Sequence, residues 1–176
     1  MEAQQQDAQQ QDAIPEMVMA YHEAGHAVIA HLYGGAIHRV SIVPTLGSTP
    51  ERPTTSAVSP DAPARAGVGR HASAVDQTRQ QLSAILAGEA ADALRSGQAH
   101  PVSTSDRDLA RTLALDLAGG DASKADAIVE AELTRTRDLL QRPDTWARVE
   151  AIAQALLRHR TLEGERLQAL LAGSEE

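Results

Sequence analysis

The sequence predicts a mainly α protein with about six helices and one small β-strand or ribbon element. Apolar residues make up 42% of the 176 residues, whereas aromatic residues make up 2% and Phe is absent. The core must therefore be built from Leu, Ile, Val and Ala. A core rich in Ala and Leu favours close-packed helices over a sheet sandwich. A short run of β-branched residues at 37–43 supplies the β element.

We expect a single domain over residues 14–176, because a chain of this length and apolar fraction can bury one core. Residues 1–13 consist almost entirely of Gln, Asp and Ala. This composition is too polar to bury against a core, so we expect a disordered polar tail.

The first helix is predicted over 17–32, where the sequence has helical composition and no internal breaker. Pro15 stands where a helix can begin, and the Gly34-Gly35 pair stands where one ends. The strand at 37–43 follows. Residues 44–70 contain five of the eight prolines, which predicts a long Pro-rich loop, with room for one short strand near 54–58.

Five further helices follow this loop. They are predicted at 71 or 74 to 95, 105–118, 122–141, 144–160 and 162–171. Gly97, the Gly119-Gly120 pair and Pro143 mark three of the helix ends. Ser105, Asp144 and Thr161 stand at the expected N-cap positions.

The sequence His22-Glu23-Ala24-Gly25-His26 is an H-E-x-x-H motif inside the first predicted helix. Residues four apart lie above one another on a helix, so both imidazoles can reach one ion. Glu23 is rotated about 100° from His22 and can act as general base toward a zinc-activated water without ligating the metal. The small residues between them leave room for close packing behind the site.

A catalytic zinc site usually has three protein ligands, so one more is needed. The extended motif with a third His does not apply, because Ile29 and Leu32 occupy its Gly and His positions. Carboxylates on the following helices are the remaining candidates. Spacing alone leaves four of them open: Glu89, Asp92, Asp106 and Asp108.

Charge and composition argue against several other kinds of partner, site and location. The 16 basic and 24 acidic residues give a net charge of −8, which disfavours nucleic acid as a partner. Cys is absent, which excludes disulfides and thiolate zinc sites. The most apolar stretch, 17–33, carries three His and one Glu, which would be costly in lipid. The N-terminus lacks a secretory signal. We therefore expect a soluble, cytoplasmic protein without a membrane segment.

Four blocks resemble, in order, the peptidase domain of the FtsH-type ATP-dependent zinc proteases. The blocks are YHEAGHAVIAHLYGGAIHRVSIV (21–43), ILAGEAADAL (85–94), VSTSDRDLARTLA (102–114) and the tail over 149–171. The resemblance implies a mostly helical fold with a small β-ribbon. It also implies that Zn²⁺ is held by His22, His26 and Asp106, with Glu23 as catalytic base.

The resemblance further implies a zinc-dependent metalloendopeptidase acting on unfolded proteins or peptides. No G-x-x-x-x-G-K-[ST] phosphate loop occurs in the sequence, so we expect a stand-alone domain without its own ATPase activity. A homo-oligomer and a separate ATPase are the further partners that the resemblance suggests. The alternative is a catalytically silent module that keeps the peptidase fold and acts in protein binding or regulation.

Overall fold

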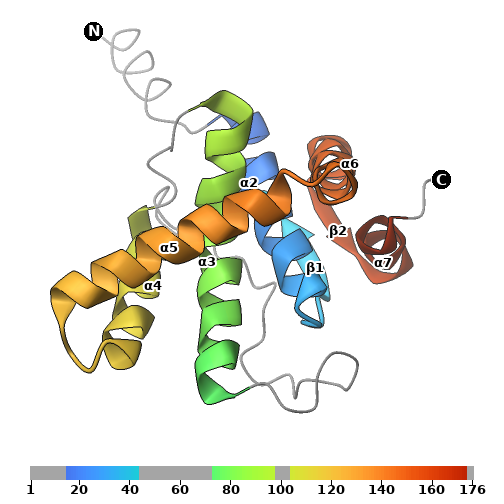
Figure 1. Ribbon diagram of the computed structural model, residues 1–176. Coiled ribbons are helices and arrows are strands. Elements are labelled where there is room, and N and C mark those ends of the chain that lie inside the picture. Colours follow the sequence, from blue (N-terminus) through green and yellow to red (C-terminus); the bar gives the residue numbers. More distant parts are fainter. Residues whose placement is uncertain (1–14, 44–72, 98–103, 174–176) are drawn as a thin grey trace, which may run out of the picture.

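The computed structural model describes residues 15–43, 73–97 and 104–173 (Figure 1). The expected polar tail at 1–13 and the Pro-rich loop at 44–70 lie outside the described residues. The described part contains six helices and two short strands, which confirms the mainly α class. In chain order these are α2 (Glu16–Leu32), β1 (Arg39–Ser41), α3 (Ala74–Ser96), α4 (Thr104–Leu117), α5 (Ala122–Leu140), α6 (Pro143–His159), β2 (Thr161–Glu163) and α7 (Gly164–Ala172).

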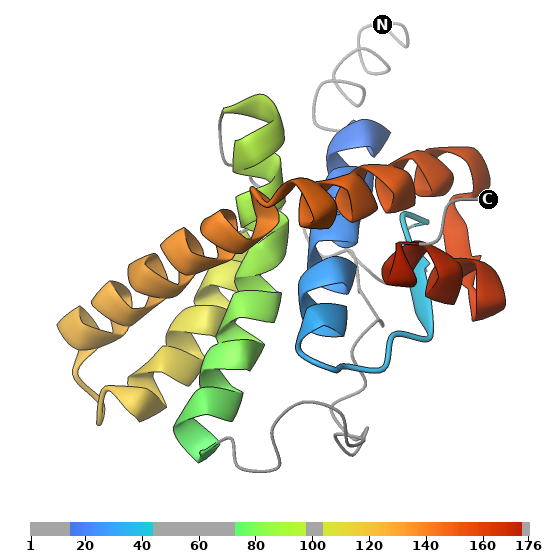
Figure 2. The ribbon, with the colours of Figure 1, turned by 45° about the vertical axis from the view of Figure 1, so that its right-hand side comes forward.

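Helix α2 lies at the centre of the molecule. Figure 2 shows α3, α4 and α5 together on one side of it, and the two strands with α7 on the other. Its main packing partners are α3 and α6. Every residue from His22 to Ala30 is buried, so the helix carrying the motif is enclosed all round. One cluster of buried apolar side chains takes members from all six helices and both strands.

The contact between α2 and α3 depends on small residues. A Cβ atom added to Gly25 would lie 2.6 Å from the carbonyl oxygen of Ala87 and 2.8 Å from the Cβ of Ala91. Such distances are shorter than real Cβ contacts, so only glycine allows the two helices to come this close. The close packing expected behind the motif is therefore present, and it brings α3 within reach of the motif's side chains.

The two strands form an antiparallel ribbon in which Arg39 pairs with Glu163 and Ser41 with Thr161. The strand predicted at 37–43 is thus confirmed but shorter. The partner strand, β2, occupies residues 161–163. The prediction of a helix over 162–171 with Thr161 as its N-cap is therefore wrong at its start. Arg160 adopts a left-handed conformation (φ 62°) at the end of α6, and the residues that follow are extended. The N-cap of α7 is Glu163.

Other helix ends follow the expected signals in part. Gly97 is the left-handed C-cap of α3 (φ 75°), as predicted. Asp144 is wrong as an N-cap, because Pro143 already occupies the first turn of α6 and Arg142 precedes it. Ser105 is likewise wrong as a cap, since α4 begins at Thr104.

In the described ranges, none of the helices combines the length and hydropathy needed to cross a bilayer.

Candidate metal centre

Helix α2 places the two motif histidines one turn apart on the face turned toward α3. The Nε2 atoms of His22 and His26 lie 3.0 Å apart, and both side chains are buried. Glu23 is also buried, and its negative charge acts on His22. The spacing of the motif thus produces a pair of imidazoles with their Nε2 atoms converging.

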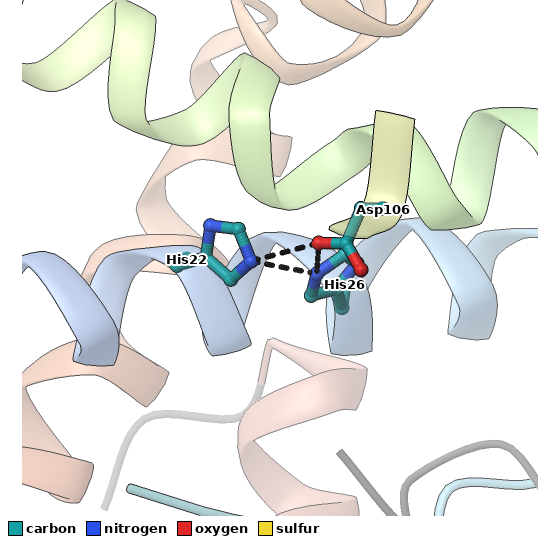
Figure 3. Close-up of side chains that lie close together, drawn as sticks. All are labelled: His22, His26 and Asp106. Carbon is teal, nitrogen blue, oxygen red and sulfur yellow. Dashed lines mark hydrogen bonds and ion pairs between the residues drawn. The ribbon is translucent and has the colours of Figure 1, made fainter. Parts of the chain in front are cut away.

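The third member of the group comes from the first turn of α4. The Oδ2 atom of Asp106 lies 3.1 Å from Nε2 of His22 and 3.3 Å from Nε2 of His26 (Figure 3). Three potential donor atoms therefore form a nearly equilateral triangle. Two donors that each lie about 2.1 Å from one tetrahedral ion are about 3.4 Å apart, so the triangle has the size of a metal site. His22, His26 and Asp106 could hold a metal ion.

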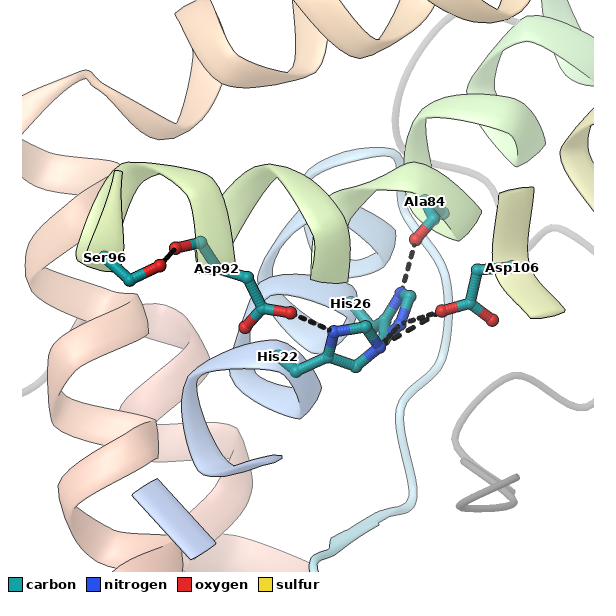
Figure 4. A network of polar contacts seen from close by, with 6 residues as sticks. All are labelled: His22, His26, Ala84, Asp92, Ser96 and Asp106. Carbon is teal, nitrogen blue, oxygen red and sulfur yellow. Dashed lines mark hydrogen bonds and ion pairs between the residues drawn. The ribbon is translucent and has the colours of Figure 1, made fainter. Parts of the chain in front are cut away.

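Two acceptors behind the rings fix their orientation (Figure 4). Nδ1 of His22 donates to Oδ2 of Asp92 over 2.9 Å, and Nδ1 of His26 donates to the carbonyl oxygen of Ala84 over 2.8 Å. A carboxylate and a carbonyl can only accept, so both rings carry a proton on Nδ1. In the neutral rings both Nε2 atoms are consequently lone-pair donors directed at one point.

A cation between the three donor atoms would stabilise this arrangement. Two lone pairs 3.0 Å apart repel each other, and the nearby carboxylate of Asp106 adds negative charge. Either a proton or a metal ion at Nε2 removes the repulsion. The chemistry of the donor set therefore fits a divalent metal ion, with two nitrogen donors and one oxygen donor.

The pKa values in the cluster follow from the same geometry. Burial disfavours the charged form of His22. The hydrogen bonds to Asp106 and Asp92, together with the negative charges of Asp92 and Glu23, outweigh burial and raise the pKa of His22 to about 10. Burial alone would raise the pKa of Asp106, but hydrogen bonds from both histidines hold it well below its ordinary value. Without a metal ion, a proton on His22 therefore neutralises part of the cluster.

A glycine of α3 forms the wall beside the imidazoles. A Cβ atom added to Gly88 would lie 2.5 Å from Nε2 of His22 and 2.5 Å from Nε2 of His26. Glycine is thus required where α3 passes the two converging nitrogens. The sequence alone does not predict this requirement, although the small residues Ala87, Ala90 and Ala91 around Gly88 are typical of a close helix approach.

The four carboxylates that spacing left open have different positions. Asp106 joins the histidines. Asp92 stands behind His22 as the acceptor of its Nδ1 hydrogen bond, a supporting role that spacing along the sequence does not predict. Glu89 pairs with Arg107, and Asp108 is exposed on α4.

No protein-family model matches this chain, and a search of the curated proteins finds no significant relative.

Proposed function

We propose that this protein is a zinc-dependent metalloendopeptidase that hydrolyses peptide bonds in unfolded proteins or peptides. His22, His26 and Asp106 hold the zinc ion, and Glu23 is the general base. Three protein ligands are the number found in catalytic zinc sites. A structural zinc site usually has four protein ligands and has no use for a neighbouring general base.

One observation carries the proposal. Both imidazoles donate their Nδ1 protons to fixed acceptors, so that both Nε2 atoms converge with Oδ2 of Asp106. In metal-binding histidines, the N–H of the other ring nitrogen characteristically donates a hydrogen bond to a carboxylate or carbonyl oxygen. This bond raises the basicity of the ligating nitrogen. The pairs His22–Asp92 and His26–Ala84 supply both kinds of acceptor.

The chemistry divides between the ion and the residues around it. Zinc in such a site lowers the pKa of water toward about 7 and polarises the peptide carbonyl. The carboxylate of Glu23 takes up the proton of the attacking water and delivers it to the leaving amide nitrogen. Burial of His22 and Glu23 excludes bulk water from the side of the site that faces the core.

The resemblance of four sequence blocks to the FtsH-type peptidase domain is consistent with the same proposal. The four resembling blocks fall on α2 with β1, on α3, on α4, and on α6 with β2 and α7. A homo-oligomer and a separate ATPase remain the proposed partners. Short or unfolded peptides are the proposed substrates, because they need no energy-driven unfolding before they reach the site.

The proposal is tested by metal analysis and by cleavage of casein with the wild type and the Glu23→Gln variant. We expect about one zinc per chain in both proteins and cleavage only in the wild type. Glu150→Gln, an exposed glutamate on α6, is the matched control and should cleave normally. Unchanged turnover in Glu23→Gln would refute the assigned base. Zinc binding without cleavage by the wild type would favour the silent binding module. If the metal analysis found iron in place of zinc, the proposed identity of the metal would be wrong.

A further inference from the structure

Helix α4 must hold Asp106 accurately, yet its apolar packing lies further along the helix. Asp106 stands in the first turn of a helix that begins at Thr104. The buried residues of α4 are Ala110 and Ala114, both beyond this turn and both small. Within α4 itself, apolar contact therefore does not anchor the turn that carries the third ligand.

The residue after Asp106 makes the contacts that could anchor this turn. Nε and Nη2 of Arg107 donate to the two carboxylate oxygens of Glu89 on α3, over 3.1 and 2.9 Å. Nη1 of Arg107 pairs with Oε1 of Glu130 on α5 at 2.8 Å. The fork-like pair with Glu89 has directional geometry that a single-point ion pair lacks. Glu89 is only 3% exposed, so this end of the pair is shielded from solvent.

Glu89 belongs to the part of α3 that also shapes the metal centre. It directly follows Gly88, which lies against both Nε2 atoms, and it is three residues from Asp92, which orients His22. The same two turns of α3 thus contact the histidines and hold the neighbour of Asp106. The Arg107–Glu89 pair therefore connects the turn of α4 that carries Asp106 to the part of α3 that faces the histidines.

We propose that Arg107 is a positioning residue, which through its fork-like pair with Glu89 sets Asp106 at the metal-binding distance from His22 and His26. The inference rests on the proposed function, since it assigns Asp106 as a metal ligand. It adds a role for two residues outside the ligand set and the general base.

A neighbouring ion pair provides a matched control. Nε of Arg111, one turn further along α4, pairs with Oδ1 of Asp126 on α5 at 2.5 Å. Both of these side chains are about half exposed, and the pair joins α4 to α5 without α3. If any arginine ion pair on α4 were sufficient to position Asp106, substitution of Arg111 would lower the metal affinity as much as substitution of Arg107.

The test compares Arg107→Lys with Arg111→Lys in the full chain. Lysine keeps the positive charge but cannot form the fork, so the change addresses geometry. Metal binding is measured by titration with Co²⁺, followed by the visible absorption of the bound ion. We expect the affinity for Co²⁺ to fall about 10- to 100-fold in Arg107→Lys, the range for lost supporting contacts. Arg111→Lys should stay within about twofold of the wild type.

A second measurement does not depend on metal. In the metal-free protein, the imidazole NMR resonances of His22 and His26 should shift in Arg107→Lys and not in Arg111→Lys, because Asp106 contacts both rings. Wild-type affinity and unshifted resonances in Arg107→Lys would overturn the positioning role while leaving the proposed function intact. If the wild type bound no Co²⁺ but the resonances shifted in Arg107→Lys alone, the positioning of Asp106 would stand and the metal-dependent function would fall.

Discussion

Asp92 lies behind the metal centre, with its Oδ2 atom 2.9 Å from Nδ1 of His22 and both side chains buried. Because this carboxylate oxygen accepts the Nδ1 hydrogen bond, it fixes the ring so that Nε2 faces His26 and Asp106. Among the described residues, the other oxygen of Asp92 has no hydrogen-bond partner. The carboxylate is therefore held mainly by its bond to His22.

Removal of the Asp92 charge should weaken metal binding without removing a ligand. In Asp92→Asn the side-chain volume is kept, but the ring loses the anion that raises the basicity of its Nε2. We expect zinc affinity to fall about 10- to 100-fold, as measured by competition with a chelator. Asp116→Asn, an exposed position on α4, is the control. Equal affinities in the two variants would mean that the Asp92–His22 bond is only structural.

The choice of third ligand can be tested on one helix. Asp106→Asn should lower zinc affinity by a factor of about 100 or more, because it removes an anionic ligand from a three-ligand site. Asp108→Asn changes an exposed side chain two residues away and should leave affinity within about twofold. Chelator competition measures both. The reverse order of effects would place the ligand at Asp108 and contradict the orientation of α4.

Gly88→Ala should block the site sterically. The new Cβ would lie 2.5 Å from Nε2 of His26, where a bound ion requires free space. Alanine has a helix propensity about 1 kcal/mol better than glycine, which offsets part of the about 1–3 kcal/mol cost of overpacking. We therefore expect a folded protein by circular dichroism that has lost zinc in metal analysis. A folded Gly88→Ala protein with a full zinc complement would show that the glycine is not part of the site.

Zinc binding should release about one proton per chain at pH 7.5. The pKa of His22 is raised to about 10 by Asp106 and Asp92 against the effect of burial, so the ring is charged at this pH without metal. The ion replaces that proton, and the release should disappear as the pH rises above the pKa. Calorimetric titration in buffers of different ionisation enthalpy measures the number of protons. No release at pH 7.5 would mean that His22 is neutral before the ion binds.

The same shift predicts how the metal-free protein responds to pH. The folded-state pKa of His22 lies above its ordinary value of 6.5, so the proton stabilises the fold fully below pH 6.5. This contribution is lost as the pH rises toward about 10. Urea denaturation of the metal-free protein should show decreasing stability over this range, and His22→Gln should show a smaller decrease. Equal slopes in both proteins would assign the pH dependence to other groups.

The sequence predicted the parts of the site that depend on one helix. His22 and His26 converge because residues four apart share a helix face, and this relation is local. The third ligand depends on how α2 and α4 meet, across a separation of 84 residues. Spacing could therefore name Asp106 only as one of four candidates, and the resemblance to a family was needed to favour it. The supporting role of Asp92 and the wall formed by Gly88 likewise depend on the packing of α3 against α2.

The β-ribbon is a second feature that depends on contacts between segments far apart in the sequence. Residues 161–163 have no strand signal of their own, and they become extended because Arg160 turns the chain and β1 offers a pairing edge. The hydroxyls of Ser41 and Thr161, 120 residues apart, lie 2.8 Å from each other across this pair. Local propensity cannot predict such a contact, and from the sequence alone the segment reads as the start of the following helix. The helices themselves were predictable to within a few residues, because glycine and proline mark many of their ends.

The most direct test of the central claim is anomalous diffraction from zinc-loaded crystals, recorded on both sides of the zinc absorption edge. We expect one strong zinc peak about 2 Å from Nε2 of His22, Nε2 of His26 and a carboxylate oxygen of Asp106. The peak should be absent from Asp106→Asn crystals grown at the same zinc concentration. A zinc peak at other residues only, or none in the wild type, would contradict the proposed metal centre.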